Sequence, residues 1–292
     1  MNCTNPYFRV LQKAENPFEG TDKGIFTPCG KCLACRINRR REWTQRLLHE
    51  SYNYPAVFIT LTYNEEHLPF DENGQQCVSK SDIQHFIQDL RNEYRGVKIR
   101  YFIGSEYGDL GRPHYHGILY NVPPDLLDRS KNWQPGMPLT KKSGKYVSII
   151  NRKLNDIWKR GFCTIGEMSR GRAGYCAKYF VDRKDAPSGA VPNFSLMSRR
   201  PGIGSLHAEA ISDKVRFHQS HSLLTDNGKY IALPRYYDRK IYTDEERKER
   251  LEGIDLTELE SPILERINSD SMDIIDYQLH RHHSYKNLKK QL

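Results

Sequence analysis

Two histidines one residue apart, His114 and His116, are the first candidates for chemistry in this sequence. On a β-strand, residues i and i+2 project from the same face, so both imidazoles would lie side by side. Glu106 precedes a turn at 107–113 that contains Gly and Pro. A hairpin across this turn would make Glu106 the direct cross-strand neighbour of His114, with His116 a diagonal away. Such a cluster would hold a divalent metal and leave positions open for water or a phosphate oxygen; the alternative is that the two histidines simply face solvent.

A helix-prone segment further along the chain carries two phenols and an ammonium. At 100° per residue, Tyr175, Lys178 and Tyr179 fall within one sector of the helix together with Asp182. The opposite sector is apolar and is expected to pack, which leaves both phenols and the ammonium available. The alternative, two core tyrosines, would need a helix buried all round, which Lys178 disfavours.

A metal-bound phosphate beside a tyrosine is the arrangement needed for phosphoryl transfer to protein. The phenol is a weak nucleophile with a pKa of ~10, so the site must activate it and must also stabilise the leaving oxygen. A divalent ion on a bridging phosphate oxygen would polarise phosphorus and neutralise the developing charge, and Lys178 would orient the phosphate and favour phenolate. Covalent capture conserves the energy of the phosphodiester bond, so a second hydroxyl could reseal the strand at the same site.

Four cysteines near the N-terminus form a second candidate metal site. Cys29, Cys32 and Cys35 follow one another at three-residue spacing, and Cys3 adds the fourth thiol that a structural Zn²⁺ requires. Zinc ribbons usually pair two Cys-x-x-Cys hooks, whereas one ligand here is a lone cysteine. Packed reduced thiols and an iron–sulfur cluster are the alternatives.

The hydrophobic pattern predicts the elements that must position these residues. In order, it predicts a strand at 57–63, a helix starting at Ser81-Asp82 and ending before Gly96, strands at 97–106 and 114–122, a helix at 154–158, a strand at 162–168 and a helix at 173–181. This order predicts an α+β fold of the split βαβ, ferredoxin-like or RRM-like type, with a central antiparallel sheet and helices stacked on one face.

The flanking segments complete the predicted organisation. Residues 36–52 read as a basic amphipathic helix whose apolar side docks and whose arginines face outward. We therefore expect three parts: a Cys-rich knuckle with the basic helix at 1–54, a catalytic core at 55–184, and basic loops with a charged helical tail at 185–292.

Composition restricts the partners of the protein. The 45 basic and 36 acidic residues leave a formal charge of +9, which favours a polyanionic partner. The longest apolar run, at 56–59, is far shorter than the ~20 residues of a membrane span, and residues 1–3 open no signal pattern. We expect no membrane partner and a location in the cytoplasm.

Three ordered motifs resemble those of the HUH rolling-circle replication initiators. The motifs are Phe58-Ile59-Thr60-Leu61-Thr62-Tyr63, residues 104–108 running into Arg112-Pro113-His114-Tyr115-His116-Gly117, and Tyr175-Cys176-Ala177-Lys178-Tyr179, and they cover about residues 56–184. With the knuckle at 29–35, the arginine-rich helix and the segment 198–204, the chain looks more specifically like the initiators of gokushovirus-type microviruses, small single-stranded DNA phages.

The resemblance implies a function and a role for each site residue. It implies that His114 and His116 bind Mg²⁺ or Mn²⁺ with Glu106 as third ligand, that Tyr175 and Tyr179 are alternating nucleophiles, and that Lys178 is the helix lysine. The reaction would be nicking of single-stranded origin DNA through a 5′-phosphotyrosine, followed by rejoining, in the cytoplasm of a bacterial host.

Other functions remain compatible with the same residues. A transposase or plasmid relaxase would use the same chemistry, and a non-catalytic single-strand binder would use the sheet and its aromatics as a stacking platform. The sequence contains no Gly-x-x-x-x-Gly-Lys-Ser/Thr loop, so unwinding is expected to fall to a host helicase and synthesis to a host DNA polymerase.

Overall fold

The computed structural model describes residues 3–13, 23–132, 139–140, 147–181, 186–218, 220–252 and 257–258. The chain divides into two compact units, one formed by residues 40–241 and the other by residues 1–39 with 242–292. The three-part division expected from the sequence stays a prediction. Within the described residues, no helix is both long enough and apolar enough to cross a membrane.

The larger unit is built on a seven-stranded sheet with the order β6-β7-β8-β3-β5-β4-β9, in which all neighbours are antiparallel. The strands are β3 (Ala56–Tyr63), β4 (Arg100–Tyr107), β5 (Pro113–Tyr120), β6 (Leu139–Thr140), β7 (Val147–Ile150), β8 (Gly161–Glu167) and β9 (Ser195–Met197). The chain visits the middle four as β3-α2-β4-β5-α5-β8, so each helix crosses over one intervening strand. These are two interlocked split βαβ units, which confirms the predicted α+β fold class.

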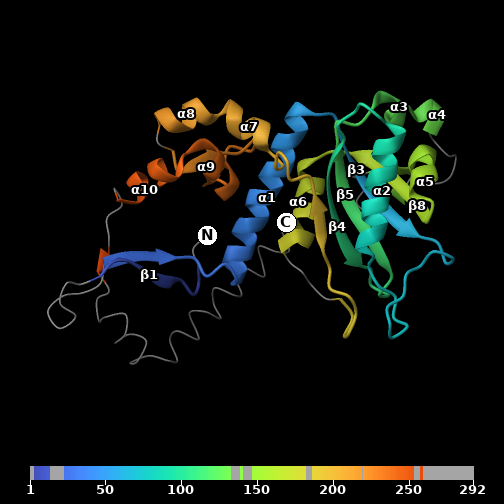
Figure 1. Ribbon diagram of the computed structural model, residues 1–292, viewed down its shortest axis with the longest axis horizontal. Coiled ribbons are helices and arrows are strands. Elements are labelled where there is room, and N and C mark those ends of the chain that lie inside the picture. Colours follow the sequence, from blue (N-terminus) through green and yellow to red (C-terminus); the bar gives the residue numbers. More distant parts are fainter. Residues whose placement is uncertain are drawn as a thin grey trace. The chain divides into compact units, whose positions relative to one another are not determined.

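Both faces of this sheet are covered by helices (Figure 1). Helices α2 (Lys80–Glu93) and α5 (Arg152–Trp158), which belong to the split βαβ units, pack on one face, where Ile59 and Leu61 are fully buried. The opposite face carries Phe58 and is covered by α1 (Leu33–Asn53) and α6 (Arg170–Val181). The predicted stacking on one face therefore describes α2 and α5, while α1 and α6 add a second layer.

Local signals explain where the helices begin. Ser79, not Ser81, caps α2, because its hydroxyl accepts a hydrogen bond of 3.2 Å from the Asp82 amide. Asn151 caps α5 in the same way by accepting from the Leu154 amide at 2.9 Å.

Helix α1 differs in one respect from the predicted amphipathic helix. Its apolar side packs as expected through Trp43, Leu47 and Leu48, but Arg46 is buried instead of facing outward. The Arg46 guanidinium lies 4.0 Å from the Trp43 ring centroid and donates to the Ile203 carbonyl at 3.0 and 3.1 Å. Burial is tolerated because the cation is hydrogen-bonded and stacked on an aromatic face.

The remaining elements of this unit are short. They are α3 (Pro124–Leu127), α4 (Arg129–Asn132), α7 (Ser205–Ala210), α8 (Ser212–Phe217), β10 (Ser222–Leu224), β11 (Tyr230–Ala232) and α9 (Arg235–Ile241).

The smaller unit contains a three-stranded antiparallel sheet of order β1-β2-β12, together with α10 (Asp244–Glu252). Strands β1 (Tyr7–Gln12) and β2 (Lys23–Thr27) pair from Tyr7 with Thr27 onward, and β12 (Thr257–Glu258) adds to β2. This pairing matters for the cysteines, because Cys3 precedes β1 and Cys29 follows β2, at the same end of the two strands.

Candidate metal and nucleophile site

The hairpin β4–β5 brings Glu106, His114 and His116 together in the predicted register. Glu106 pairs directly with His114, and His116 pairs with Gly104. Glu106 Oε2 lies 3.3 Å from the Nε2 atom of each histidine, and one ligand atom from each residue lies within 4.8 Å of the others. The three side chains are 11 to 23% exposed, so the cluster is open to solvent on one side.

The other nitrogen of each histidine is held by a neighbour. His114 Nδ1 lies 3.2 Å from the Arg112 carbonyl, which can only accept, so Nδ1 carries the proton in this contact. His116 Nδ1 lies 3.0 Å from the Thr60 hydroxyl. A protonated Nδ1 leaves the Nε2 lone pair free, which is the form that coordinates a metal.

Sequence reasoning gave no role to Thr60, and the structure gives it a place next to the cluster. Thr60 is the residue of β3 that pairs with His116 of β5, so its side chain lies on the same face as the imidazole. The signal that could have found it is the period-2 alternation of β3, once β3 is known to neighbour β5. The second threonine, Thr62, instead donates to the Phe162 carbonyl at 3.1 Å.

Tyr175 is the tyrosine that the structure places at this cluster. Helix α6 docks on the sheet through the buried Ala173, Cys176 and Ala177. Docking on that side directs Tyr175 toward the histidines, so its hydroxyl lies 3.3 Å from Glu106 Oε2 and 3.2 Å from His116 Nε2. The phenol ring also stands edge-on to the His116 imidazole, with centroids 4.8 Å apart.

The other two residues predicted on this helix are less fully defined. Lys178 is half-buried in α6, three residues after Tyr175. Tyr179 belongs to the same helix one turn after Tyr175, but its side chain lies outside the described residues. The roles of Lys178 and Tyr179 stay predictions.

The residues present fit a divalent metal. At about 2.1 Å from an ion, neighbouring ligands of an octahedral site lie about 3 Å apart. The observed separations of 3.3 Å between Glu106 Oε2 and each imidazole Nε2 match that requirement closely. Three ligands on one side of such an ion leave its other positions open.

The four N-terminal cysteines also converge. Cys3 Sγ lies 3.4 Å from Cys29 Sγ and 3.8 Å from Cys32 Sγ, and all four sulfur atoms, with Cys35, lie within 4.8 Å of one another. Four sulfurs at about 2.3 Å from a tetrahedral ion are roughly 3.8 Å apart, so the cluster has the dimensions of a tetrahedral thiolate site.

The cysteine cluster also contains an easily ionised thiol. Burial disfavours the Cys32 thiolate, but hydrogen bonds from Thr4 and Cys35 outweigh it and lower the pKa of Cys32 to about 5. Burial raises the pKa of Cys35 to about 12. One thiolate among neutral thiols is the charge distribution that a bound cation would extend to the remaining sulfurs.

The fold and the cluster together define a protein of the HUH type, in which paired strand histidines face a helix tyrosine. Comparison with known proteins identifies the family. Residues 56–184 match the family model of replication-associated proteins of the ORF2 type. The chain is 34% identical over 227 residues to the replication-associated protein ORF2 of Spiroplasma virus 4, covering 73% of this chain and 67% of the relative.

Two further relatives agree. The replication-associated protein VP4 of Bdellovibrio phage phiMH2K is 30% identical, with 72% of this chain and 65% of the relative covered. The replication-associated protein ORF4 of Chlamydia phage 1 is 27% identical, with coverage of 72% and 52%. No solved structure matches the chain.

The chain therefore belongs to the family of phage replication-associated proteins, and its predicted place among the rolling-circle replication initiators of small phages is confirmed. Its role is in the initiation of phage DNA replication. The match spans between about half and two thirds of the length of these relatives.

Proposed function

We propose that the protein is a metal-dependent, tyrosine-type endonuclease and ligase that nicks single-stranded DNA at the phage origin. The observation that carries this proposal is the position of the Tyr175 hydroxyl, within 3.3 Å of both Glu106 and His116. A phosphate bound at the cluster would stand beside the phenol oxygen, which is the placement that a nucleophile needs. The formal charge of +9 favours a polyanionic substrate.

Glu106, His114 and His116 would hold Mg²⁺ or Mn²⁺, whose remaining positions suit water and phosphate oxygens. The ion supplies Lewis acidity, polarising the phosphate and neutralising the charge that develops on it. The protein keeps both imidazoles in the coordinating form through the Arg112 carbonyl and the Thr60 hydroxyl.

In the first step, the Tyr175 oxygen forms a bond to phosphorus as the bond between phosphorus and the 3′ oxygen breaks. The phenol loses its proton and the departing oxygen gains one, which leaves a 5′-phosphotyrosine and a free 3′-hydroxyl. The number of phosphodiester bonds does not change, so attack by a 3′-hydroxyl on the phosphotyrosine rejoins a strand. We assign Tyr179, one turn further along α6, as the second nucleophile, and Lys178 to orient the phosphate and favour phenolate.

We further propose that Cys3, Cys29, Cys32 and Cys35 hold a structural Zn²⁺, and that a host helicase and DNA polymerase act with the protein in the host cytoplasm. Elemental analysis of protein purified without chelator tests the zinc assignment, with about one equivalent of zinc expected. Iron in place of zinc would indicate an iron–sulfur cluster, and less than about half an equivalent of either metal would indicate packed thiols.

Covalent capture of DNA tests the nuclease proposal. The protein is incubated with labelled single-stranded fragments of the phage genome and Mn²⁺, and a labelled protein band that survives denaturation is expected. Excess chelator and Tyr175→Phe should both remove the band, whereas Tyr230→Phe, at a tyrosine 73% exposed on β11, should retain it. Binding of DNA without any such band in the wild type would make the protein a non-catalytic single-strand binder.

A further inference from the structure

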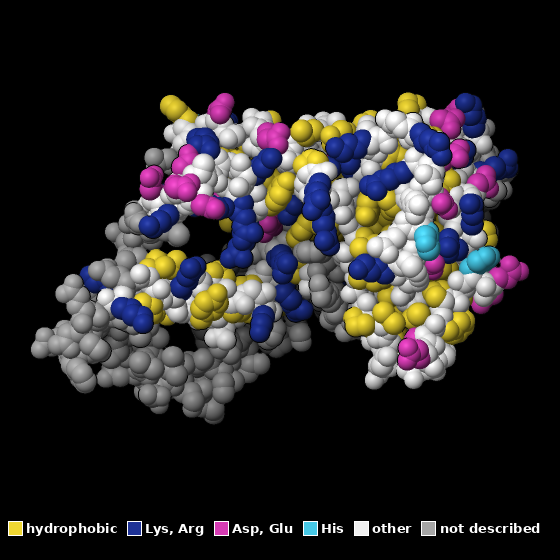
Figure 2. All heavy atoms as spheres, in the orientation of Figure 1, with side chains coloured by type: hydrophobic (Ala, Val, Ile, Leu, Met, Phe, Trp, Pro, Cys, Tyr) yellow, Lys and Arg dark blue, Asp and Glu magenta, His cyan; other side chains and the backbone are white. Residues whose placement is uncertain are grey.

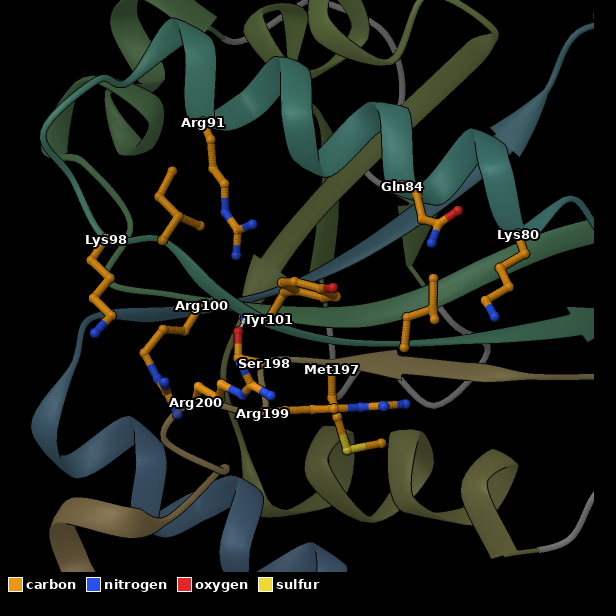
Figure 3. A pocket seen from close by; sticks show the side chains of 12 residues that line it. Lys80, Gln84, Arg91, Lys98, Arg100, Tyr101, Met197, Ser198, Arg199 and Arg200 are labelled. Atoms are coloured by element: carbon orange, nitrogen blue, oxygen red, sulfur yellow. Dashed lines mark hydrogen bonds between the residues drawn. The ribbon is translucent and has the colours of Figure 1, made fainter.

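A second surface of the larger unit is built for an anion. It is a groove of about 530 Å³ between α2, the start of β4, and β9 with the segment that follows it. Figure 3 shows Lys80, Gln84 and Arg91 extending from one side of α2, opposite Arg199 and Arg200. Lys98 and Tyr101 lie at the start of β4 between these two sides.

The charge of the groove is of one sign. Five exposed cations line it and no carboxylate does; the cations are Lys80, Arg91, Lys98, Arg199 and Arg200. Within the described part of the chain, none of the five lies within ion-pair distance of an acidic side chain. Nearby surface lysines do find partners, because Lys153 pairs with Glu93 and Lys159 pairs with Asp89.

Five like charges without counter-charges repel one another, and a polyanion in the groove would relieve that repulsion. Figure 2 shows Lys and Arg side chains gathered on this face beside α2.

The side of the groove that carries Arg199 and Arg200 is fixed in place. The buried Arg100 pairs with Glu50 of α1 and donates to the carbonyls of Pro201 and Gly202 at 3.0 and 3.1 Å. Glu50 also accepts from the Gly204 amide at 2.6 Å. The segment 198–204, singled out in the sequence but given no role by the metal cluster, is therefore a preformed arm of the groove.

The groove lies away from the metal cluster. Tyr101 and Glu106 are five residues apart on β4, a separation of roughly 17 Å, and odd and even positions of a strand face opposite sides of the sheet. A ligand in the groove would therefore not occupy the metal cluster.

We propose that this groove is a second binding site for single-stranded DNA and holds the phosphate backbone of nucleotides distant from the one that is cut. The inference rests on the nuclease function proposed above for its relation to the cut site. A single strand fits better than a duplex, because the groove combines cations with Tyr101, Leu196 and Met197, and bases of a single strand can contact such aromatic and apolar side chains.

The site would raise affinity and hold the substrate in one direction across the β4–β9 edge, without taking part in the cleavage.

The test compares two triple variants that remove the same charge. The groove variant carries Arg91→Gln, Lys98→Gln and Arg199→Gln. The control variant carries three neutralised cations that are exposed elsewhere in the same unit, Lys214→Gln, Lys229→Gln and Arg235→Gln. Fluorescence anisotropy measures affinity for a long single-stranded oligonucleotide over a range of salt concentrations, and single-turnover nicking is measured for a series shortened from either end.

We expect the groove variant to lose affinity on the order of a hundredfold at 50 mM salt and to reduce the slope of log K against log salt by about 2, since each single-strand phosphate contact contributes ~0.7. The control variant should stay close to wild type on both measures. For the shortest oligonucleotide that is still cut, the groove variant and wild type should nick at equal rates.

Three results would overturn the groove assignment. They are an unchanged salt slope, an equal loss in the control variant, or equally effective competition by duplex DNA or by an acidic polypeptide. Failure of the nuclease proposal is distinguishable, because it would leave the affinity difference intact while the wild type formed no covalent adduct with any oligonucleotide.

Discussion

Thr60→Val tests whether the strand next to the histidines sets their metal affinity. Valine keeps the β-branched shape and the strand preference of threonine but removes the hydroxyl that contacts His116 Nδ1 at 3.0 Å. A neutral hydrogen bond of this kind contributes about 1 kcal/mol net, and loss of a partner that orients a metal-bound imidazole typically costs tenfold or more in affinity. We therefore expect Mn²⁺ to bind about five- to tenfold more weakly.

The assay is a titration of DNA nicking against Mn²⁺ concentration, together with direct Mn²⁺ binding measured by calorimetry. Because Thr60 acts only through the imidazole, saturating Mn²⁺ should restore the nicking rate to near the wild-type value. Thr62→Val is the matched control, since Thr62 lies on the same strand but donates to a backbone carbonyl. Equal Mn²⁺ affinities in Thr60→Val and Thr62→Val would refute the reasoning, and thermal unfolding of both variants would detect a general loss of stability.

Three further predictions follow from the site and the core. His114→Ala and His116→Ala should each abolish metal-dependent nicking while single-strand affinity changes little, because basic residues supply most of it; nicking by either variant in excess chelator would contradict the metal assignment. Tyr175→Phe and Tyr179→Phe should each retain some single-turnover nicking but fail in strand transfer, and mass spectrometry of DNA-linked peptides should find both tyrosines modified in wild type; a single variant that rejoins circles normally would exclude alternation. Burial, with the neighbouring His207, lowers the pKa of His49 to about 3, so the folded state resists its protonation. The free energy of unfolding should fall by up to about 1.4 kcal/mol per pH unit as pH drops from about 6.5 toward 3, and His49→Gln should flatten this dependence in denaturant titrations.

The sequence was sufficient for the part of the site that one hairpin determines. The period of two placed His114 and His116 on one face, and the turn between the strands set Glu106 opposite His114, so local rules gave the correct register. Helical periodicity likewise gave the apolar side of α6 and hence the direction of Tyr175.

What the sequence did not predict depends on contacts between distant segments. Thr60 reaches His116 only because β3 pairs with β5, a neighbour 56 residues away. Arg46 reads as a solvent-facing charge until Ile203 offers it a buried carbonyl. The second helical layer of α1 and α6 was missed for the same reason, since the pattern of a helix indicates which side packs but not which face of the sheet receives it.

The placement of all three candidate ligands on one hairpin has a consequence for how such proteins diverge. Strand β5 is held on its outer side by β3, and β4 is held by β9, so the register of Glu106 with His114 does not depend on the turn that joins them. Insertions and substitutions at 108–112 can accumulate in a lineage without moving the ligands. That turn is therefore a position where related phages can alter the surface beside the scissile strand, and so recognise different origins, while the chemistry is inherited unchanged.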